Sequence, residues 1–292
     1  MSPSQAFVTN LELRASNPDG TEGAGLSHSS EGLFLLHVLE LAAEGEPRGG
    51  VAVVHGAGDH GGRYQSLAES FAASGWAVAL PDLRGHGSSE GDRGHSWGLP
   101  EPVRDIGAVL DHIAYRLPDS PKAVVGQGLG GLYALAFALQ NPGSLAKLVL
   151  INPMLEPKPT APGKPGGLKG LFKKPQPTDT GTWPFGADAL LADDSARRAF
   201  EADSKTHFET TRHVAENLPS EAAAICAKAS GLSVPTLLVL GTDDPVAPPA
   251  KARELLGSKA EILEVPGARH DVLNESGWEA TAERMVTWMS AI

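Results

Sequence analysis

Short apolar or β-branched runs alternate along the chain with longer stretches whose apolar residues recur at helical spacing. This alternation is typical of a parallel β-sheet covered by α-helices. Seven strands are predicted, over Leu33 to Leu39, Val51 to His55, Ala77 to Leu80, Ala123 to Val125, Leu148 to Ile151, Thr236 to Leu240 and Ile262 to Val265. The run from Thr9 to Arg14 is a candidate antiparallel strand at the sheet edge. The pattern therefore predicts the α/β fold class.

Four apolar stripes at helical spacing predict the helices between and after these strands. They comprise Tyr64, Leu67, Ala68 and Phe71, then Val103, Ile106, Leu110 and Ile113, then the run Leu129 to Gln140, and last Trp278, Ala282, Met285, Val286 and Met289. Gly75 is placed to end the first helix, and Asn141-Pro142 closes the third. Such stripes indicate core packing.

One region interrupts this rhythm. Between Pro153 and Pro177 the chain has seven prolines, four glycines and five lysines, which disfavours both helix interiors and a packed core. Polar, weakly helical sequence follows from about Ala187 to Ala229. We therefore interpret residues 152–232 as an insertion, a loop followed by covering helices, between two parts of a core domain at residues 1–151 and 233–292.

Composition excludes several classes of protein. The chain has 292 residues, 41% of them hydrophobic, and a formal net charge of -11. An acidic surface argues against nucleic acid as a partner, because phosphate binding needs basic residues. No apolar run reaches ten residues and no basic start precedes an apolar stretch, so we expect a cytoplasmic, soluble protein without a secretory signal. Cys226 is the only cysteine, which excludes an internal disulfide and a zinc site built on several cysteines.

Candidate chemistry lies at the carboxyl ends of predicted strands, where an open α/β sheet places its active site. The first feature is the turn His55-Gly56-Ala57-Gly58. A turn of this kind can aim a backbone N–H into the crevice, as an oxyanion hole requires. A plain tight turn is the alternative interpretation.

The second feature, residues 126–131, reads Gly-Gln-Gly-Leu-Gly-Gly between a strand and an apolar helix. It matches the hydrolase elbow G-x-S-x-G, except that Gly128 stands at the nucleophile position. It also satisfies G-x-G-x-x-G, a dinucleotide-binding pattern, but the next strand ends in Asn152-Pro153 with no acidic residue for a ribose. We therefore favour the elbow, and the absence of a following Lys-Ser/Thr pair excludes a P-loop.

The third feature is a pair. Asp244 follows the strand Thr236 to Leu240, and His270 follows the strand Ile262 to Val265. A carboxylate after one strand and a histidine after the next can meet, so that the carboxylate holds the imidazole tautomer. The order of elbow, Asp and His, each at a strand end, indicates hydrolase chemistry.

On these residues the chain resembles the α/β-hydrolase family, in its monoacylglycerol lipase and lysophospholipase branch. Residues 55–64, HGAGDHGGRY, are similar to the branch's HGxGEHSGRY block, and residues 82–91, DLRGHGSSEG, to its D-x-RGHGxSxG block. The resemblance implies a mostly parallel eight-stranded sheet flanked by helices, with a cap insertion. It implies Asp244 as the triad acid, His270 as the general base, and Ala57 and Leu129 as the oxyanion-hole donors. Substrate contacts are expected from His55, Gly56 and Gln127, although His55, with His60 and His86, is also expected to make structural hydrogen bonds.

Gly128 departs from the family pattern. Glycine has no side-chain atom that can attack a carbonyl, so the acyl-enzyme route is closed, and we expect an inactive or nearly inactive form. Two origins fit, a deliberate Ser→Gly change or natural loss of the nucleophile. The intact acid, base and oxyanion turn favour a recent or deliberate change.

The resemblance implies a lipid-like acyl ester as substrate, and no cofactor or metal is expected. A non-catalytic acyl-ligand-binding pseudoenzyme, a short-chain esterase and a cofactor-free lyase stay open as alternatives. The segment Gly167 to Lys174 mixes apolar and basic residues and could touch an anionic membrane surface, although we favour a solvated loop. His207 and His213 lack metal-ligand spacing, and Asp243 is expected to face solvent.

Overall fold

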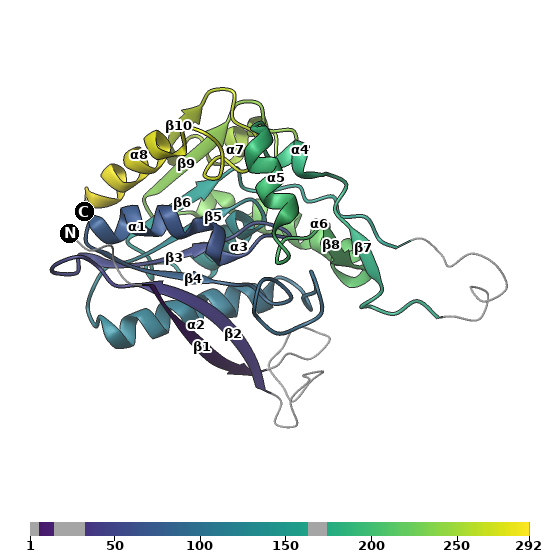
Figure 1. Cartoon of the computed structure of the whole chain (residues 1–292), viewed down its shortest axis with the longest axis horizontal. Helices are drawn as coiled ribbons and strands as arrows, with labels where there is room; N and C mark the ends of the chain where they lie inside the picture. Colours follow the sequence, from purple (N-terminus) through teal and green to yellow (C-terminus); the bar gives the residue numbers. More distant parts are fainter. Residues whose placement is uncertain (1–5, 15–32, 163–173, 292) are drawn as a thin grey trace.

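An eight-stranded sheet forms the centre of the computed structural model, which describes residues 6–14, 33–162 and 174–291 (Figure 1). The strand order is β1-β2-β4-β3-β5-β6-β9-β10. The bounds are β1 Ala6–Arg14, β2 Leu33–Leu41, β3 Gly49–Val54, β4 Trp76–Pro81, β5 Lys122–Gln127, β6 Lys147–Ile151, β9 Thr236–Gly241 and β10 Ala260–Val265. Strand β2 pairs antiparallel with β1 and β4, and the other pairings are parallel. The prediction of a mostly parallel eight-stranded sheet with an antiparallel edge is confirmed.

Each central strand is buried on both faces, because helices cover both sides of the sheet. In β3 the side chains of Val51 and Val53 belong to one core cluster, while those of Ala52 and Val54 belong to the other. This alternation is the two-residue period of a strand. A strand covered on both faces needs apolar residues at every position, which explains the continuous apolar runs in the sequence.

Helices α1 (Gln65–Ala73) and α8 (Trp278–Ser290) pack on one face of the sheet. Helices α2 (Pro100–Arg116), α3 (Leu129–Gln140) and α7 (Pro249–Leu256) pack on the other. The bounds predicted for the third helix, α3, agree with the structure at both ends. Helix α7 was not predicted, since its eight residues contribute only Ala252 and Leu256 to the core.

The segment between β6 and β9 lies at one end of the sheet, on the right of Figure 1. It contains β7 (Thr180–Thr182), α4 (Ala187–Leu190), α5 (Asp194–Ala202), β8 (Glu209–Thr211) and α6 (Arg212–Cys226), and β7 pairs antiparallel with β8. Side chains of α6, such as Leu218 and Ala222, share the core cluster of α3. Of the basic segment 167–174 only Lys174 lies within the described residues.

Across the described ranges, no helix is both long and apolar enough to cross a membrane.

Candidate active site

The Asp244 and His270 side chains meet at the carboxyl end of the sheet. Asp244 Oδ2 lies 2.8 Å from His270 Nδ1, and both side chains are buried. The other carboxylate oxygen of Asp244 accepts hydrogen bonds from the backbone amides of Val246 (2.8 Å) and Ala247 (3.0 Å). Because an ionised carboxylate only accepts, His270 Nδ1 carries the hydrogen in this contact, and the lone pair of a neutral ring lies on Nε2.

His270 Nε2 lies over Gly128. A Cβ atom built on Gly128 would stand 2.6 Å from this nitrogen, and Nε2 has no hydrogen-bond partner among the described residues. Gly128 has φ 54° and ψ -114°, a left-handed conformation that strains any residue with a side chain. The backbone at position 128 therefore has the sharp strand-to-helix turn expected of an elbow, and the imidazole occupies part of the space a side chain would need.

Close packing brings the end of β3 against the start of α3. A Cβ on Gly130 would stand 2.4 Å from the carbonyl oxygens of both Val54 and His55, so only glycine permits this approach. Leu129 is the first residue of α3, so its amide has no partner within the helix. Ala57 and His270 also line one small cavity.

The loop that carries His270 is held by two side chains. Asn152 donates through Nδ2 to the carbonyl oxygens of Arg269 and His270, both at 2.9 Å, and its Oδ1 accepts from the Gly241 amide at 2.8 Å. Gln127 Nε2 also donates to the His270 carbonyl, at 2.9 Å. These two residues join the ends of β5, β6 and β9 to the histidine loop. Asn152 was not predicted as a site residue, although an Asn-Pro pair directly after a buried strand is a usable signal.

The structure corrects the expected substrate contact of His55. Its side chain is fully buried, Nδ1 donates to the Gly56 carbonyl at 2.8 Å, and Nε2 accepts from the Leu83 amide at 2.8 Å. Burial lowers the pKa of His55 to about 4, so the ring is neutral and both nitrogens are engaged. His55 instead makes the structural hydrogen bonds that were the other expectation for this residue, and they position the turn. Gly56 and Gln127 do line the small cavity with His270.

The His55 ring begins a row of three buried imidazoles. Ring centroids lie 5.1 Å apart for His55 and His86, and 4.9 Å apart for His86 and His207. Burial lowers the pKa of His86 and of His207 to about 3 each. This row joins the sheet end to the inserted segment and stays uncharged at neutral pH.

A buried charged cluster supports the loop of Ala57. The Arg63 guanidinium lies 2.9 Å from Asp59 Oδ1 and 2.9 Å from Asp271 Oδ2, and the Tyr64 hydroxyl donates to Asp59 Oδ2 at 2.9 Å. Burial raises the pKa of both carboxyl groups, and the Arg63 charge opposes that rise. Arg63 therefore ties the loop of Ala57 to Asp271, the residue that follows His270.

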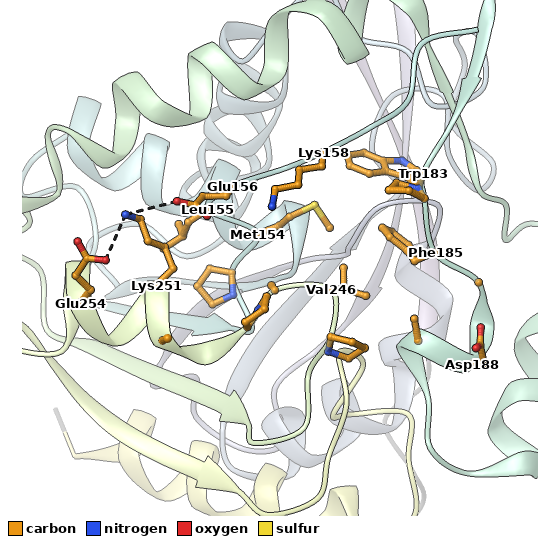
Figure 2. Close-up of a pocket in the computed structure, with 18 residues that line it drawn as sticks. Met154, Leu155, Glu156, Lys158, Trp183, Phe185, Asp188, Val246, Lys251 and Glu254 are labelled. Carbon is orange, nitrogen blue, oxygen red and sulfur yellow. Dashed lines mark hydrogen bonds and ion pairs between the residues drawn. The ribbon is translucent and has the colours of Figure 1, made fainter. Parts of the chain in front are cut away.

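An apolar cleft with a cavity volume of about 820 Å³ lies beside the Asp244–His270 pair (Figure 2). Its apolar lining includes Met154, Trp183, Phe185 and Val246, and the ion pairs of Lys251 with Glu156 and Glu254 lie at one end. Met154, which lines the cleft, donates its amide to the Gly128 carbonyl at 2.8 Å. Phe185 lines both this cleft and the small cavity of His270.

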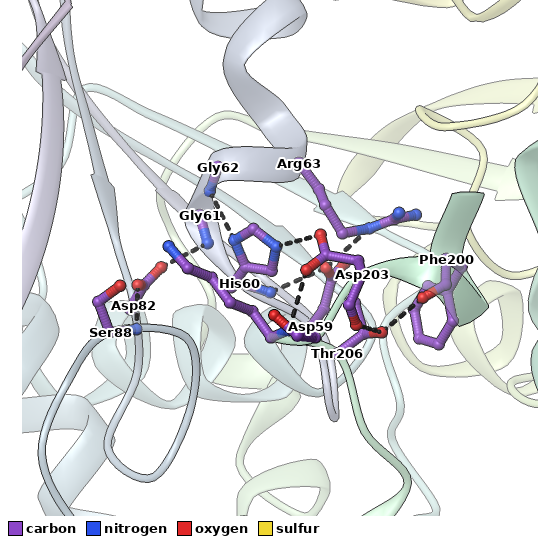
Figure 3. Close-up of polar contacts among 12 residues, drawn as sticks. Asp59, His60, Gly61, Gly62, Arg63, Asp82, Ser88, Phe200, Asp203 and Thr206 are labelled. Carbon is purple, nitrogen blue, oxygen red and sulfur yellow. Dashed lines mark hydrogen bonds and ion pairs between the residues drawn. The ribbon is translucent and has the colours of Figure 1, made fainter.

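The segment after α5 is docked on the loop of Ala57 (Figure 3). His60 Nε2 donates to Asp203 Oδ2 at 2.8 Å, since its Nδ1 accepts from the Gly62 amide at 3.2 Å. The Arg63 guanidinium lies 4.8 Å from the centroid of the Phe200 ring, a cation–π contact. The inserted segment thus closes one side of the site.

Nothing in the described parts of the chain groups three or more His, Cys, Asp or Glu side chains as a metal site would require.

Sheet order, elbow and buried Asp–His pair together define an α/β-hydrolase. The chain belongs to the family described as serine aminopeptidase, S33, whose model matches residues 45–277. It is 29% identical to the monoacylglycerol lipase of Mycolicibacterium smegmatis, over 84% of this chain and 89% of that protein. It is 36% identical to the monoglyceride lipase of Homo sapiens over 39% of this chain and 38% of that one.

Among solved structures, the monoacylglycerol lipase of Paleococcus ferrophilus superposes with a TM-score of 0.75 at 26% identity, covering 88% of this chain and 98% of that one. The predicted α/β-hydrolase fold and the resemblance to the monoacylglycerol lipase branch are confirmed.

Proposed function

We propose that this protein has the site of a carboxylic ester hydrolase acting on lipid-like acyl esters, and that Gly128 stands where the family has its nucleophilic serine. The observation that carries the proposal is the buried Asp244–His270 pair, whose free nitrogen faces Gly128. Asp244 is the triad acid and His270 the general base. The Ala57 and Leu129 amides form the oxyanion hole.

The chemistry follows from the positions of these groups. A serine hydroxyl at position 128 would give its proton to His270 Nε2 and attack the ester carbonyl, and the two amides would stabilise the oxyanion. His270 would then protonate the leaving alcohol and activate a water to release the acid. With glycine the first bond cannot form, so the site can only bind and polarise the ester. Enzymes of this kind without their triad keep about 10³–10⁴-fold acceleration over water.

The substrate class is supported by the apolar cleft and by the relatives. A cleft lined by Met154, Trp183, Phe185 and Val246 beside the Asp244–His270 pair suits the acyl chain of such an ester. The relatives from Mycolicibacterium smegmatis and Homo sapiens are named monoacylglycerol lipase and monoglyceride lipase. Residues 152–232 would be the cap that supplies much of this cleft. The cytoplasmic location stays a prediction.

The test is to restore the nucleophile. The Gly128→Ser protein should hydrolyse p-nitrophenyl esters at least about 10³-fold faster than the unmodified protein, once the imidazole withdraws from the 2.6 Å contact with the new Cβ. A chain-length series from acetate to palmitate would separate a lipase from a short-chain esterase by its optimum. The matched control is Gly128→Ala, which adds the Cβ without the hydroxyl and should stay inactive. A correctly folded Gly128→Ser protein without esterase activity at any chain length would refute the proposal.

A further inference from the structure

Three hollows lie near the elbow, and the residues that line them show how they are separated. The cavity lined by Gln127 and His270 has a volume of about 10 Å³, room for no more than one water molecule. A second cavity, of about 20 Å³, is lined by Leu129. The large cleft of about 820 Å³ is lined by none of these three residues. The cleft as it stands therefore does not reach His270.

Two aromatic side chains separate the cleft from the two cavities (Figure 2). Within the described ranges, Phe185 is the one residue that lines both the cleft and the cavity of His270. Trp183 is the one residue there that lines both the cleft and the cavity of Leu129. The two rings are stacked, with centroids 5.8 Å apart and an interplanar angle of 29°. Together they form a partition between the cleft and the elbow.

The two rings of this partition are held differently. Trp183 is buried, with 4% of the residue exposed, and its backbone amide donates to the Phe208 carbonyl at 2.9 Å. Phe185 is only half-buried, and its ring meets the Phe208 ring edge-on at 6.1 Å between centroids. A half-buried ring loses less buried apolar area when it turns away. Phe185 is therefore the member of the partition that moves at lower cost.

The partition bears on the length of the acyl chain. An ester attacked at position 128 must bring its carbonyl beside His270 Nε2, which is buried. A long acyl chain then extends from there into the cleft, so it must keep the Phe185 ring displaced, whereas a short acyl group ends before the ring. We infer that Phe185 is a specificity-determining residue, a barrier between His270 and the cleft that disfavours long acyl chains relative to short ones. The inference rests on the proposed function for the acyl ester, although the barrier itself does not.

Chemical labelling tests the barrier in the unmodified protein. Diethyl pyrocarbonate acylates a neutral imidazole at an unbonded nitrogen, which in the described structure of His270 is Nε2, and it needs no nucleophile at position 128. Peptide mass spectrometry gives the rate at each histidine, with the half-buried His112 of α2 as the reference. His270 should react at least about ten-fold more slowly than His112, because labelling of a buried atom depends on opening of the structure. Equal rates would overturn the inference.

Variants at position 185 locate the barrier. Phe185→Ala should raise the labelling rate of His270 at least about ten-fold and leave that of His112 unchanged, because it joins the cleft to the cavity. Leu155→Ala is the matched control, since Leu155 also lines the cleft with an apolar side chain but does not line the cavity of His270. It should leave the His270 rate nearly unchanged. Phe185→Leu removes less of the ring and should act in the same direction. An unchanged His270 rate in whichever Phe185 variant folds would refute the assignment.

The second readout is the chain-length preference. In the Gly128→Ser protein, Phe185→Ala should raise kcat/KM for p-nitrophenyl decanoate relative to the acetate at least about ten-fold, since the long chain no longer has to displace a ring. An unchanged ratio would contradict the role in specificity.

The outcomes also separate the two proposals. Faster labelling of His270 in Phe185→Ala, together with an inert Gly128→Ser protein, defeats the hydrolase assignment and keeps the barrier. An active Gly128→Ser protein whose Phe185→Ala variant shows unchanged labelling and an unchanged ratio defeats only this inference.

Discussion

The loops after β3 and β10 each place a buried histidine at the same end of the sheet, yet the two side chains do different things. His55 has both ring nitrogens bonded, to the Gly56 carbonyl and the Leu83 amide. His270 has one nitrogen bonded to Asp244, and its other nitrogen faces Gly128 with no partner in the part of the chain that the structure describes. Buried polar atoms in proteins are nearly always paired. The unpaired nitrogen therefore marks the place for a ligand or a reacting group, and the paired ring marks structure.

The difference follows from what the neighbouring strand ends supply. Strand β4 lies beside β3, and its exit brings a backbone amide to the ring of His55. The turn after β5, which faces His270, has no side chain at its apex. A backbone amide is always present at a strand end, whereas a partner for His270 depends on the residue at position 128.

The largest effect should come from the acid that orients His270. In the Gly128→Ser protein, Asp244→Asn should lower kcat for ester hydrolysis by about 10⁴-fold, because an amide no longer holds the reactive tautomer. Asp243→Asn is the matched control, since this neighbouring carboxylate is exposed, and it should leave kcat nearly unchanged. Similar losses in the two variants would contradict the distinction between them.

The two histidines should also contribute differently to the free energy of unfolding, and here the larger contribution should come from His55. His55→Ala leaves the buried Leu83 amide without an acceptor and opens a cavity, so it should lower the free energy of unfolding by about 3 kcal/mol. His270→Ala should cost less, because Asp244 keeps its two amide donors. Urea denaturation of both variants measures the difference. A larger loss for His270→Ala would reverse the assignment of structural and functional roles.

The smallest expected effect is a pH dependence of the free energy of unfolding. It comes from His86, the middle ring of the row that begins at His55. The pKa of His86 is lowered to about 3, so between that value and about 6.5 the unfolded chain takes up a proton that the folded chain does not. Stability from this residue is full above pH 6.5 and falls as the pH drops, by about 1.4 kcal/mol per pH unit. His86→Gln lacks the titrating ring. Relative to the unmodified protein, its free energy of unfolding should therefore rise by about 1.4 kcal/mol for each pH unit from pH 6.5 down to 4.5. Urea curves at three pH values test this, and a constant difference would show that His86 is charged in the folded state.

The contacts around the site separate what local sequence can predict from what it cannot. The apolar runs predicted the strands, and α3 was predicted at both ends, because its apolar face is continuous and Asn141-Pro142 stops it. Helix α7 was missed because eight residues with two buried side chains carry little periodic signal. The His60–Asp203 hydrogen bond joins residues 143 positions apart, and neither residue has a neighbour in the chain that indicates the other.

By itself, the sequence determined the order of the strands' apolar runs, the elbow with glycine at its apex, and the positions of Asp244 and His270 after successive strands. These features are local, since strand period and turn chemistry depend on neighbouring residues. Only the tertiary structure decided that Asn152 and Gln127 hold the His270 loop, that His55 is fully bonded, and that His270 Nε2 comes within 2.6 Å of a Cβ position on Gly128. Those outcomes depend on which strand ends become neighbours in the sheet, and on how closely glycine lets them approach.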